Sequence, residues 1–158
     1  MNNTITQNKN LLSPTNFKLS IASNRFANVE YFCVNCNLPA CSMTEVNLPF
    51  KQFANSVSGE RINYEPLNIR FIVDENTKNY SEILLWLVSN STEDTIVTSD
   101  ATLSILNSSN LPNRSIKFHD IFPTSLGGID FSTQTLDVEH VTIDASFRYS
   151  HFELLPTS

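Results

Sequence analysis

The sequence predicts a mainly β domain, an antiparallel β-barrel or sandwich with one flanking α-helix and one long extended loop. Several short segments alternate apolar and polar residues, which is typical of half-buried strands. A single segment has apolar residues at helical spacing. Turn-forming residues separate the alternating segments. Many short antiparallel strands with one helix favour a barrel or sandwich, and the pattern leaves the topology open.

The first half of the chain predicts three strands. Strict alternation over residues 16–21 indicates the first, and residues 29–34 indicate the second. Pro39 ends the second strand because proline cannot donate to a β-ladder. Residues 67–73 alternate again and predict the third. Between them, residues 40–58 carry only short apolar pieces among polar residues, which predicts a long, partly extended loop.

One helix is predicted over residues 77–89. Its apolar stripe follows the i, i+3, i+4, i+7, i+8 pattern and consists of Tyr80, Ile83, Leu84, Leu87 and Val88. The acidic and amide residues at 74–76 supply capping chemistry at its start. Trp86 lies on the other flank, where we expect it to pack under the helix rather than line a ligand site.

The second half predicts a hairpin and a closing strand. Residues 101–105 and 115–118 alternate on either side of a turn-rich segment, which indicates the hairpin. Residues 129–131 predict a short strand, and residues 141–149 show the cleanest alternation in the chain. Between the hairpin and these strands, residues 121–128 predict that the strand ends and a turn follows.

Two of the three glycines, Gly127 and Gly128, lie in that predicted turn. Because glycine adopts positive φ without steric cost, we expect the bend to need it there.

The length of 158 residues fits one domain, which buries enough surface for a core without metal or disulfides. No internal repeat or linker divides it. We expect residues 1–15 to form a flexible N-terminal arm, residues 16–152 the β domain, and residues 153–158 a C-terminal tail.

Charged residues make up only 16% of the chain, below the roughly 25% of soluble domains. Asn, Ser and Thr supply the polarity instead. Such a surface suits hydrogen-bonded contact with other proteins. A compositional bias of the genome would produce the same numbers, and both interpretations stay open.

The net charge of −6 and the scattered basic residues argue against tight nucleic-acid binding, which needs clustered Lys and Arg. No segment approaches the roughly 20 apolar residues of a membrane helix, so we expect no membrane contact. The first ten residues are polar, and we expect no signal peptide.

Neither a metal site nor a catalytic site is predicted. The candidate metal ligands are Cys33, Cys36, Cys41, His119, His140 and His151. A structural zinc site usually needs two ligand pairs, and the histidines here are isolated. A strand over residues 28–36 would point Cys33 and Cys36 to opposite faces, so we expect reduced, half-buried thiols.

Catalytic motifs are also missing. No Gly-x-Ser-x-Gly elbow occurs, and three glycines provide no phosphate-cradling loop. The adjacent carboxylates at 74–75 and 93–94 are typical of caps and solvated charges. We therefore expect no enzyme and no cofactor.

Several features follow one another along residues 16–150: the first strand, a second strand closing in Leu38-Pro39, the Gly59-Glu60-Arg61 step, an Asp74-Glu75 pair before the helix, the helix residue Trp86, the Ile121-Phe122-Pro123 to Gly127 turn, and the last strand. In this order and spacing, the chain resembles the tail-tube proteins of contractile-tailed bacteriophages and related injection machines. Glu60 departs from the Asp that the family usually carries there.

The resemblance implies hexameric rings that stack into a tube inside a contractile sheath, with sheath and baseplate proteins as partners. DNA would pass through without specific binding, and the subunit would belong to a virion tail assembled in the host cytoplasm. The expected ring and subunit contacts are Val46, Leu48, Pro49, Phe50, Phe53, Gly59, Glu60 and Arg61. An acidic lumen would repel DNA, with Asp130, Glu139 and Asp144 as candidate lining residues.

Three alternatives remain at this stage. A baseplate tube-initiator or a tail-terminal protein would share the fold, and so would the effector-carrying tube protein of a secretion system. A jelly-roll carbohydrate-binding module would instead expose aromatic residues on one sheet face. The aromatics Phe17, Phe71, Phe118 and Phe147 fall on the apolar side of their alternations, which favours the core.

Overall fold

The computed structural model describes residues 15–22, 33–49, 54–92, 94, 96–133 and 140–156. Its elements in chain order are β1 (Phe17–Ile21), β2 (Cys33–Cys36), β3 (Cys41–Pro49), β4 (Ala54–Tyr64), β5 (Leu67–Ile72), α2 (Lys78–Thr92), β6 (Ser99–Leu106), β7 (Pro112–Leu126), β8 (Thr142–Arg148) and β9 (His151–Leu154). The predicted mainly β class with one flanking helix is confirmed for the described residues.

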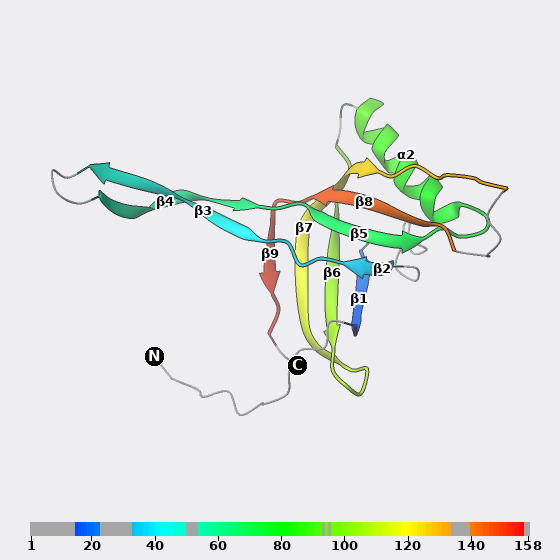
Figure 1. Ribbon diagram of the computed structural model, residues 1–158, viewed down its shortest axis with the longest axis horizontal. Coiled ribbons are helices and arrows are strands. Elements are labelled where there is room, and N and C mark those ends of the chain that lie inside the picture. The colour runs from blue at the N-terminus through cyan, green and yellow to red at the C-terminus, as the bar shows by residue number, and fades with distance from the viewer. Residues whose placement is uncertain are drawn as a thin grey trace.

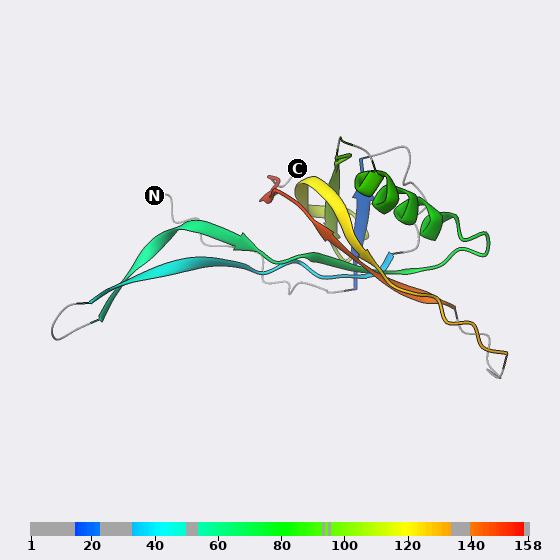
Figure 2. The same cartoon turned by 90° about the horizontal axis from the view of Figure 1, so that it is seen from above.

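Seven strands form one antiparallel sheet in the order β1-β6-β7-β8-β5-β2, with β9 also paired to β7. β3 and β4 form a separate two-stranded sheet. The large sheet folds over on itself, so that its two end strands, β1 and β2, come close together (Figure 1). Helix α2 packs against β7 (Figures 1 and 2).

The fold-over depends on a bend in β7, which runs through both halves of the sheet. Its first part pairs with β6 and β9, and its last part pairs with β8. Asp120 adopts φ 54° at the bend, a conformation that Asp tolerates better than most residues. Opposite it, the Ser150 hydroxyl donates to Asp120 Oδ2 at 2.8 Å, and the Ser150 amide donates to His119 O at 2.9 Å. These two hydrogen bonds therefore hold the segment between β8 and β9 against β7 at its bend.

The core lies between the two halves of the sheet and under the helix. Its largest fully buried side chains are Phe71, Phe118, Phe147, Leu19, Leu67, Ile69, Ile83, Ile116 and Ile121, together with Asn79. The alternating strands supply most of them, since one face of each strand points inward. The prediction that Phe71, Phe118 and Phe147 belong to the core is confirmed, and Phe17 is partly buried against it.

The buried face of α2 differs from the predicted stripe. Ile83 and Trp86 are buried, whereas Leu84 and Val88 are exposed. Trp86 packs against Phe147 with ring centroids 6.0 Å apart, and its Nε1 donates to Val97 O at 2.8 Å. The buried face of α2 therefore consists of Asn79, Ile83 and Trp86.

The predicted stop over residues 121–128 is wrong in two respects. β7 continues to Leu126, and Pro123 is accommodated because this part of β7 pairs on one side with β8. All three glycines lie in the described part of the chain, and none of them has positive φ. Gly127 instead lies against β8, where an added Cβ would come within 3.1 Å of Asp144 O. Residues 129–131, expected as a short strand, lie outside the strands.

Two further differences concern the long loop and the C-terminus. Most of residues 40–58 belong to β3 and β4 rather than to a loop. His151–Leu154 forms β9, which the sequence pattern did not predict.

Among the described residues, no helix is long and apolar enough to cross a membrane.

Candidate assembly interface

The folded-over seven-stranded sheet forms an open barrel, and the β3–β4 hairpin projects from this barrel as a long arm (Figures 1 and 2). It continues the β2–β5 pair, because β2 leads into β3 and β4 leads into β5. Every residue of β3 is exposed. An isolated two-stranded hairpin is at best marginally stable in water. An arm of this length is therefore expected to find further contacts outside the single chain.

The outer half of the arm has one apolar and one polar face. Val46 lies directly opposite Val57, and alternation places Leu48 on the same face. These three side chains are 50%, 43% and 43% exposed, in the order Val46, Val57, Leu48. On the other face, the Ser56 hydroxyl donates to Asn47 Oδ1 at 2.7 Å. The apolar face is thus available to a partner.

A bulge in β4 divides the arm. Between the pairs Met43–Ile62 and Glu45–Ser58, β3 has only Thr44, whereas β4 has three residues, 59–61. A Cβ on Gly59 would overlap the carbonyl group of Thr44. Glycine is therefore required here by the close approach of the two backbones, not by positive φ.

The inner half of the arm carries a second apolar pair. Met43 and Ile62 are 51% and 49% exposed. The Ser58 hydroxyl lies 2.8 Å from Met43 Sδ, which places Met43 on the face that carries Ser58 and, by alternation, Asn47. The arm therefore offers apolar side chains on both faces, one pair near the barrel and a group farther out.

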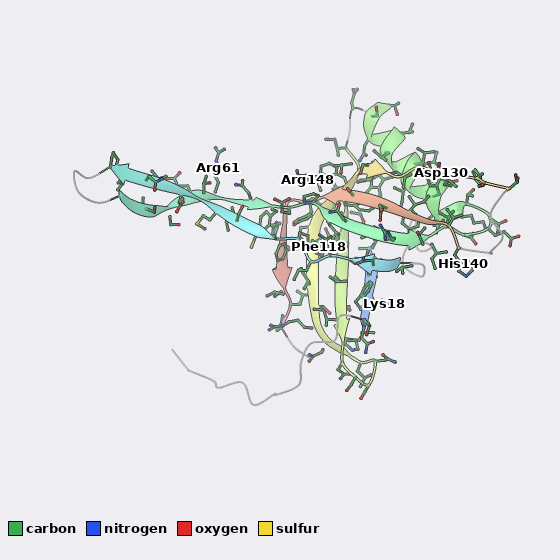
Figure 3. The ribbon with its side chains drawn as sticks, in the orientation of Figure 1. Lys18, Arg61, Phe118, Asp130, His140 and Arg148 are labelled. Atoms are coloured by element: carbon green, nitrogen blue, oxygen red, sulfur yellow. The ribbon has the colours of Figure 1, made fainter. Side chains whose placement is uncertain are left out.

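The structure brings most of the predicted contact residues together on this arm. Val46, Leu48 and Pro49 lie on β3, and Gly59, Glu60 and Arg61 form the bulge of β4. Figure 3 shows Arg61 on the arm, away from the barrel. Phe50 and Phe53 lie outside the described residues. The sequence did not indicate Met43, Val57 and Ile62 as contact residues, because their cross-strand pairing is visible only once the register is known.

Open strand edges form a second candidate contact. Among the described strands, β2 pairs only with β5, and residues 122–126 of β7 pair only with β8. These two edges lie at opposite ends of the half-sheet made by β7, β8, β5 and β2. Unpaired edges are templates for pairing with another chain.

The outer face of this half-sheet is polar and internally bonded. Arg70 holds Asp144 through two hydrogen bonds, of 2.7 and 2.9 Å. This pair lowers the pKa of Asp144. The neighbouring Ser146 hydroxyl donates to Asn68 Oδ1 at 2.6 Å. The face is therefore hydrophilic, and its Asp144 charge is balanced by Arg70.

The other two candidate lumen residues are Asp130 and Glu139. Asp130 belongs to the connection after β7, at the end of the molecule remote from the arm (Figure 3). Glu139 lies outside the described residues. Of the three candidates, the structure thus describes Asp130 and Asp144, and their role in a lumen stays a prediction.

Cys33 and Cys36 face the same side of β2, contrary to the expectation from simple alternation. The register shifts between Cys33 and Asn35, so that Cys33 lies opposite Phe71 and Cys36 opposite Ile69. Burial raises the pKa of Cys33 to about 11 and that of Cys36 to about 12. Thiols with such pKa values are poor nucleophiles and poor metal ligands at neutral pH.

Among the residues that the structure describes, no group of three or more His, Cys, Asp or Glu side chains is placed to hold a metal ion.

The comparisons with known proteins rest on structure alone, since no protein-family model and no curated protein matches the sequence. A chain from the baseplate of the anti-feeding prophage superposes with a TM-score of 0.72 and 12% identity, covering 92% of this chain and 96% of that one. A chain from the sheath–tube complex of PVC, an extracellular contractile injection system, gives 0.66 and 14% identity, covering 93% of each chain.

A third similar chain comes from the sheath/tube terminator of PVC in its extended state. It gives a TM-score of 0.71 and 14% identity, and the match covers 94% of this chain and 99% of that one. At such identities the likeness shows the fold. The chain therefore has the tail-tube fold, as the sequence resemblance predicted.

Proposed function

We propose that this chain is a non-catalytic structural subunit of a tail tube, whose rings stack to form a conduit. The observation that carries the proposal is the projecting arm with uncovered apolar side chains on a tail-tube fold. Proteins with this fold occur in a sheath–tube complex and in a tube terminator. A tube subunit needs an element that reaches a neighbouring copy, and the arm has that form.

Within one ring, the two open edges of the half-sheet offer a way to join copies. The β2 edge of one copy would pair with residues 122–126 of the next, so that the half-sheets run continuously around the ring. Six copies per ring is the number that the family resemblance implies. Such pairing removes the exposed edges, which otherwise favour aggregation.

Between rings, the arm would lie against the neighbouring ring. Its outer apolar face of Val46, Leu48 and Val57 and its inner pair of Met43 and Ile62 point to opposite sides. An arm placed between two neighbouring copies would bury both groups. Phe50 and Phe53 belong to the same proposed contact.

The conduit would carry DNA past a wall that it does not bind. The net charge of −6 disfavours adhesion of a polyanion. Asp130, Glu139 and Asp144 remain the proposed lumen residues, although the pairing of Asp144 with Arg70 means that Asp144 adds little net charge. Sheath and baseplate proteins are the proposed partners, in a virion tail assembled in the host cytoplasm.

Two alternatives keep the same fold. The likeness to a tube terminator favours a protein that ends a tube. An effector-carrying tube protein of a secretion system, which would carry proteins in place of DNA, would share the fold as well. A carbohydrate-binding module is disfavoured, because Phe71, Phe118 and Phe147 are buried rather than displayed on a sheet face.

Electron microscopy of the purified chain at rising concentration tests the proposal. A tube subunit will form rings and then tubes with a central hole whose length increases with concentration. A terminator will form single rings that do not elongate. Particles that remain monomeric at every concentration, even after tube fragments of the same system are added as nuclei, would refute the proposal.

A further inference from the structure

The base of the arm is packed into a cluster of four aromatic rings. Tyr64, the last residue of β4, lies 5.8 Å from Tyr149 and 5.5 Å from Phe152, measured between ring centroids. Phe118 lies 5.1 Å from Tyr149 and 5.7 Å from Phe152. The rings meet in tilted and edge-to-face arrangements, which aromatic pairs prefer. The cluster thus joins the arm to β7 and β9.

Two side chains also hold the backbone where the arm leaves the barrel. The Tyr149 hydroxyl donates to Glu65 O at 2.8 Å, and Arg148 Nη1 donates to Tyr64 O at 3.1 Å. Figure 3 shows Arg148 at this junction. The Tyr149 hydroxyl carries its proton at neutral pH, as tyrosine ordinarily does, and burial raises its pKa further, to about 12. Two consecutive carbonyl groups are therefore fixed from one corner of the barrel.

The two chain segments that join the arm to the barrel are also bonded to each other. The Glu65 amide donates to Ala40 O at 3.0 Å, which links the segment after β4 to the segment before β3. On the barrel side, Asn37 Oδ1 accepts a hydrogen bond of 2.8 Å from the Asn68 amide. Both ends of the arm are thus held at its base.

We infer that Tyr64, Arg148, Tyr149 and Phe152 form a clamp that sets the direction of the arm and so presents it ready for docking. This inference rests on the proposed function, and it assigns positioning residues to the same contact. None of these residues lies on the outer half of the arm, so they act through its orientation rather than by touching the tip's partner.

The length of the arm explains why its base needs to be rigid. The nine residues of β3 extend over about 30 Å at about 3.4 Å per residue. A rotation of about 10° at the base therefore moves the tip by about 5 Å, roughly one strand spacing. An arm that is fixed before docking also loses less conformational freedom when it binds.

The test loosens the clamp and measures both direction and assembly. Tyr149→Phe combined with Arg148→Leu removes both hydrogen bonds to the backbone and keeps the ring of residue 149. Spin labels carried by noncanonical residues at Asn47 on the arm and Ser108 in the β6–β7 turn report the distance between arm and barrel. Tyr80→Phe, on the exterior helix, is the matched control.

We expect a single narrow distance distribution for the wild type and the control. The double variant is expected to give a broad distribution, with little change in melting temperature. It should need at least about tenfold more protein for assembly, which corresponds to about 1.4 kcal/mol. If the double variant folds poorly, Tyr149→Phe alone provides the same readouts with a smaller change.

Several results would overturn the inference. An unchanged narrow distribution in the double variant would show that the clamp does not set the direction. A broad distribution with unchanged assembly would show that direction does not matter for docking. Failure of the proposed function has a different signature: the wild type itself would then form neither rings nor tubes, whatever the distance measurement gives.

Discussion

The apolar outer face of the arm predicts a strong, face-specific effect of charge on assembly. Fully burying a leucine contributes about 1.5–3 kcal/mol, and Leu48 is 43% exposed in the single chain. Covering it on docking thus contributes about 0.6–1.3 kcal/mol per subunit. Leu48→Asp removes this contribution and adds the desolvation of a charge, which together cost at least about 3 kcal/mol. The concentration required for assembly should rise at least about 100-fold.

Asn47→Asp is the matched control, since it places the same charge one residue away on the polar face. We expect it to change the assembly concentration by less than about threefold, a difference below about 0.7 kcal/mol. Both sites are exposed, so both variants should melt within about 2 °C of the wild type. Sedimentation of assembled material across a concentration series measures the effect. Equal losses of assembly in the two variants would refute the face-specific reasoning.

Three further predictions concern the helix, the bulge and the half-buried thiols. Trp86→Ala should lower the free energy of unfolding by about 3–5 kcal/mol in urea, because it empties the space beside Phe147 and removes the bond to Val97 O. Gly59→Ala should block assembly, because the added Cβ overlaps the carbonyl group of Thr44 and distorts the arm. The melting temperature should not fall, because both residues lie on the arm and outside the core. Stability should fall as the pH rises above 9.0, the ordinary pKa of cysteine, toward about 11–12, because the thiols of Cys33 and Cys36 ionise first in the unfolded chain.

The controls for these three predictions differ. Trp86→Phe should cost clearly less than Trp86→Ala, and equal costs would contradict the cavity argument. Normal assembly of Gly59→Ala would show that the bulge geometry is dispensable. Cys36→Ala should flatten the alkaline loss of stability, and an unchanged pH profile would contradict the role assigned to the thiols.

Strands with one buried face were predictable from the sequence. β1, β5 and β8 alternate strictly because their inward side chains, such as Leu19, Ile69 and Ala145, pack into the core. The arm escaped prediction for the opposite reason. Both of its faces are exposed, its apolar groups change face along the arm, and the bulge at Gly59 interrupts the register. Its apolar residues nevertheless marked it as a contact region.

Other differences arose where tertiary packing decides. In α2, Trp86 is buried, whereas Leu84 and Val88 of the apolar stripe are exposed. The bulge between Cys33 and Asn35 turns both Cys33 and Cys36 inward, which simple alternation cannot foresee. The clamp at Tyr64 and Tyr149 joins residues far apart in the chain, and only the fold brings them together.

A structure of the assembled protein, determined by electron cryo-microscopy, would show directly whether the arm joins one copy to another. We expect stacked rings in which the β3–β4 arm of each subunit lies against another copy, with Val46, Leu48 and Val57 covered. Assemblies in which these three side chains remain in contact with solvent would contradict it.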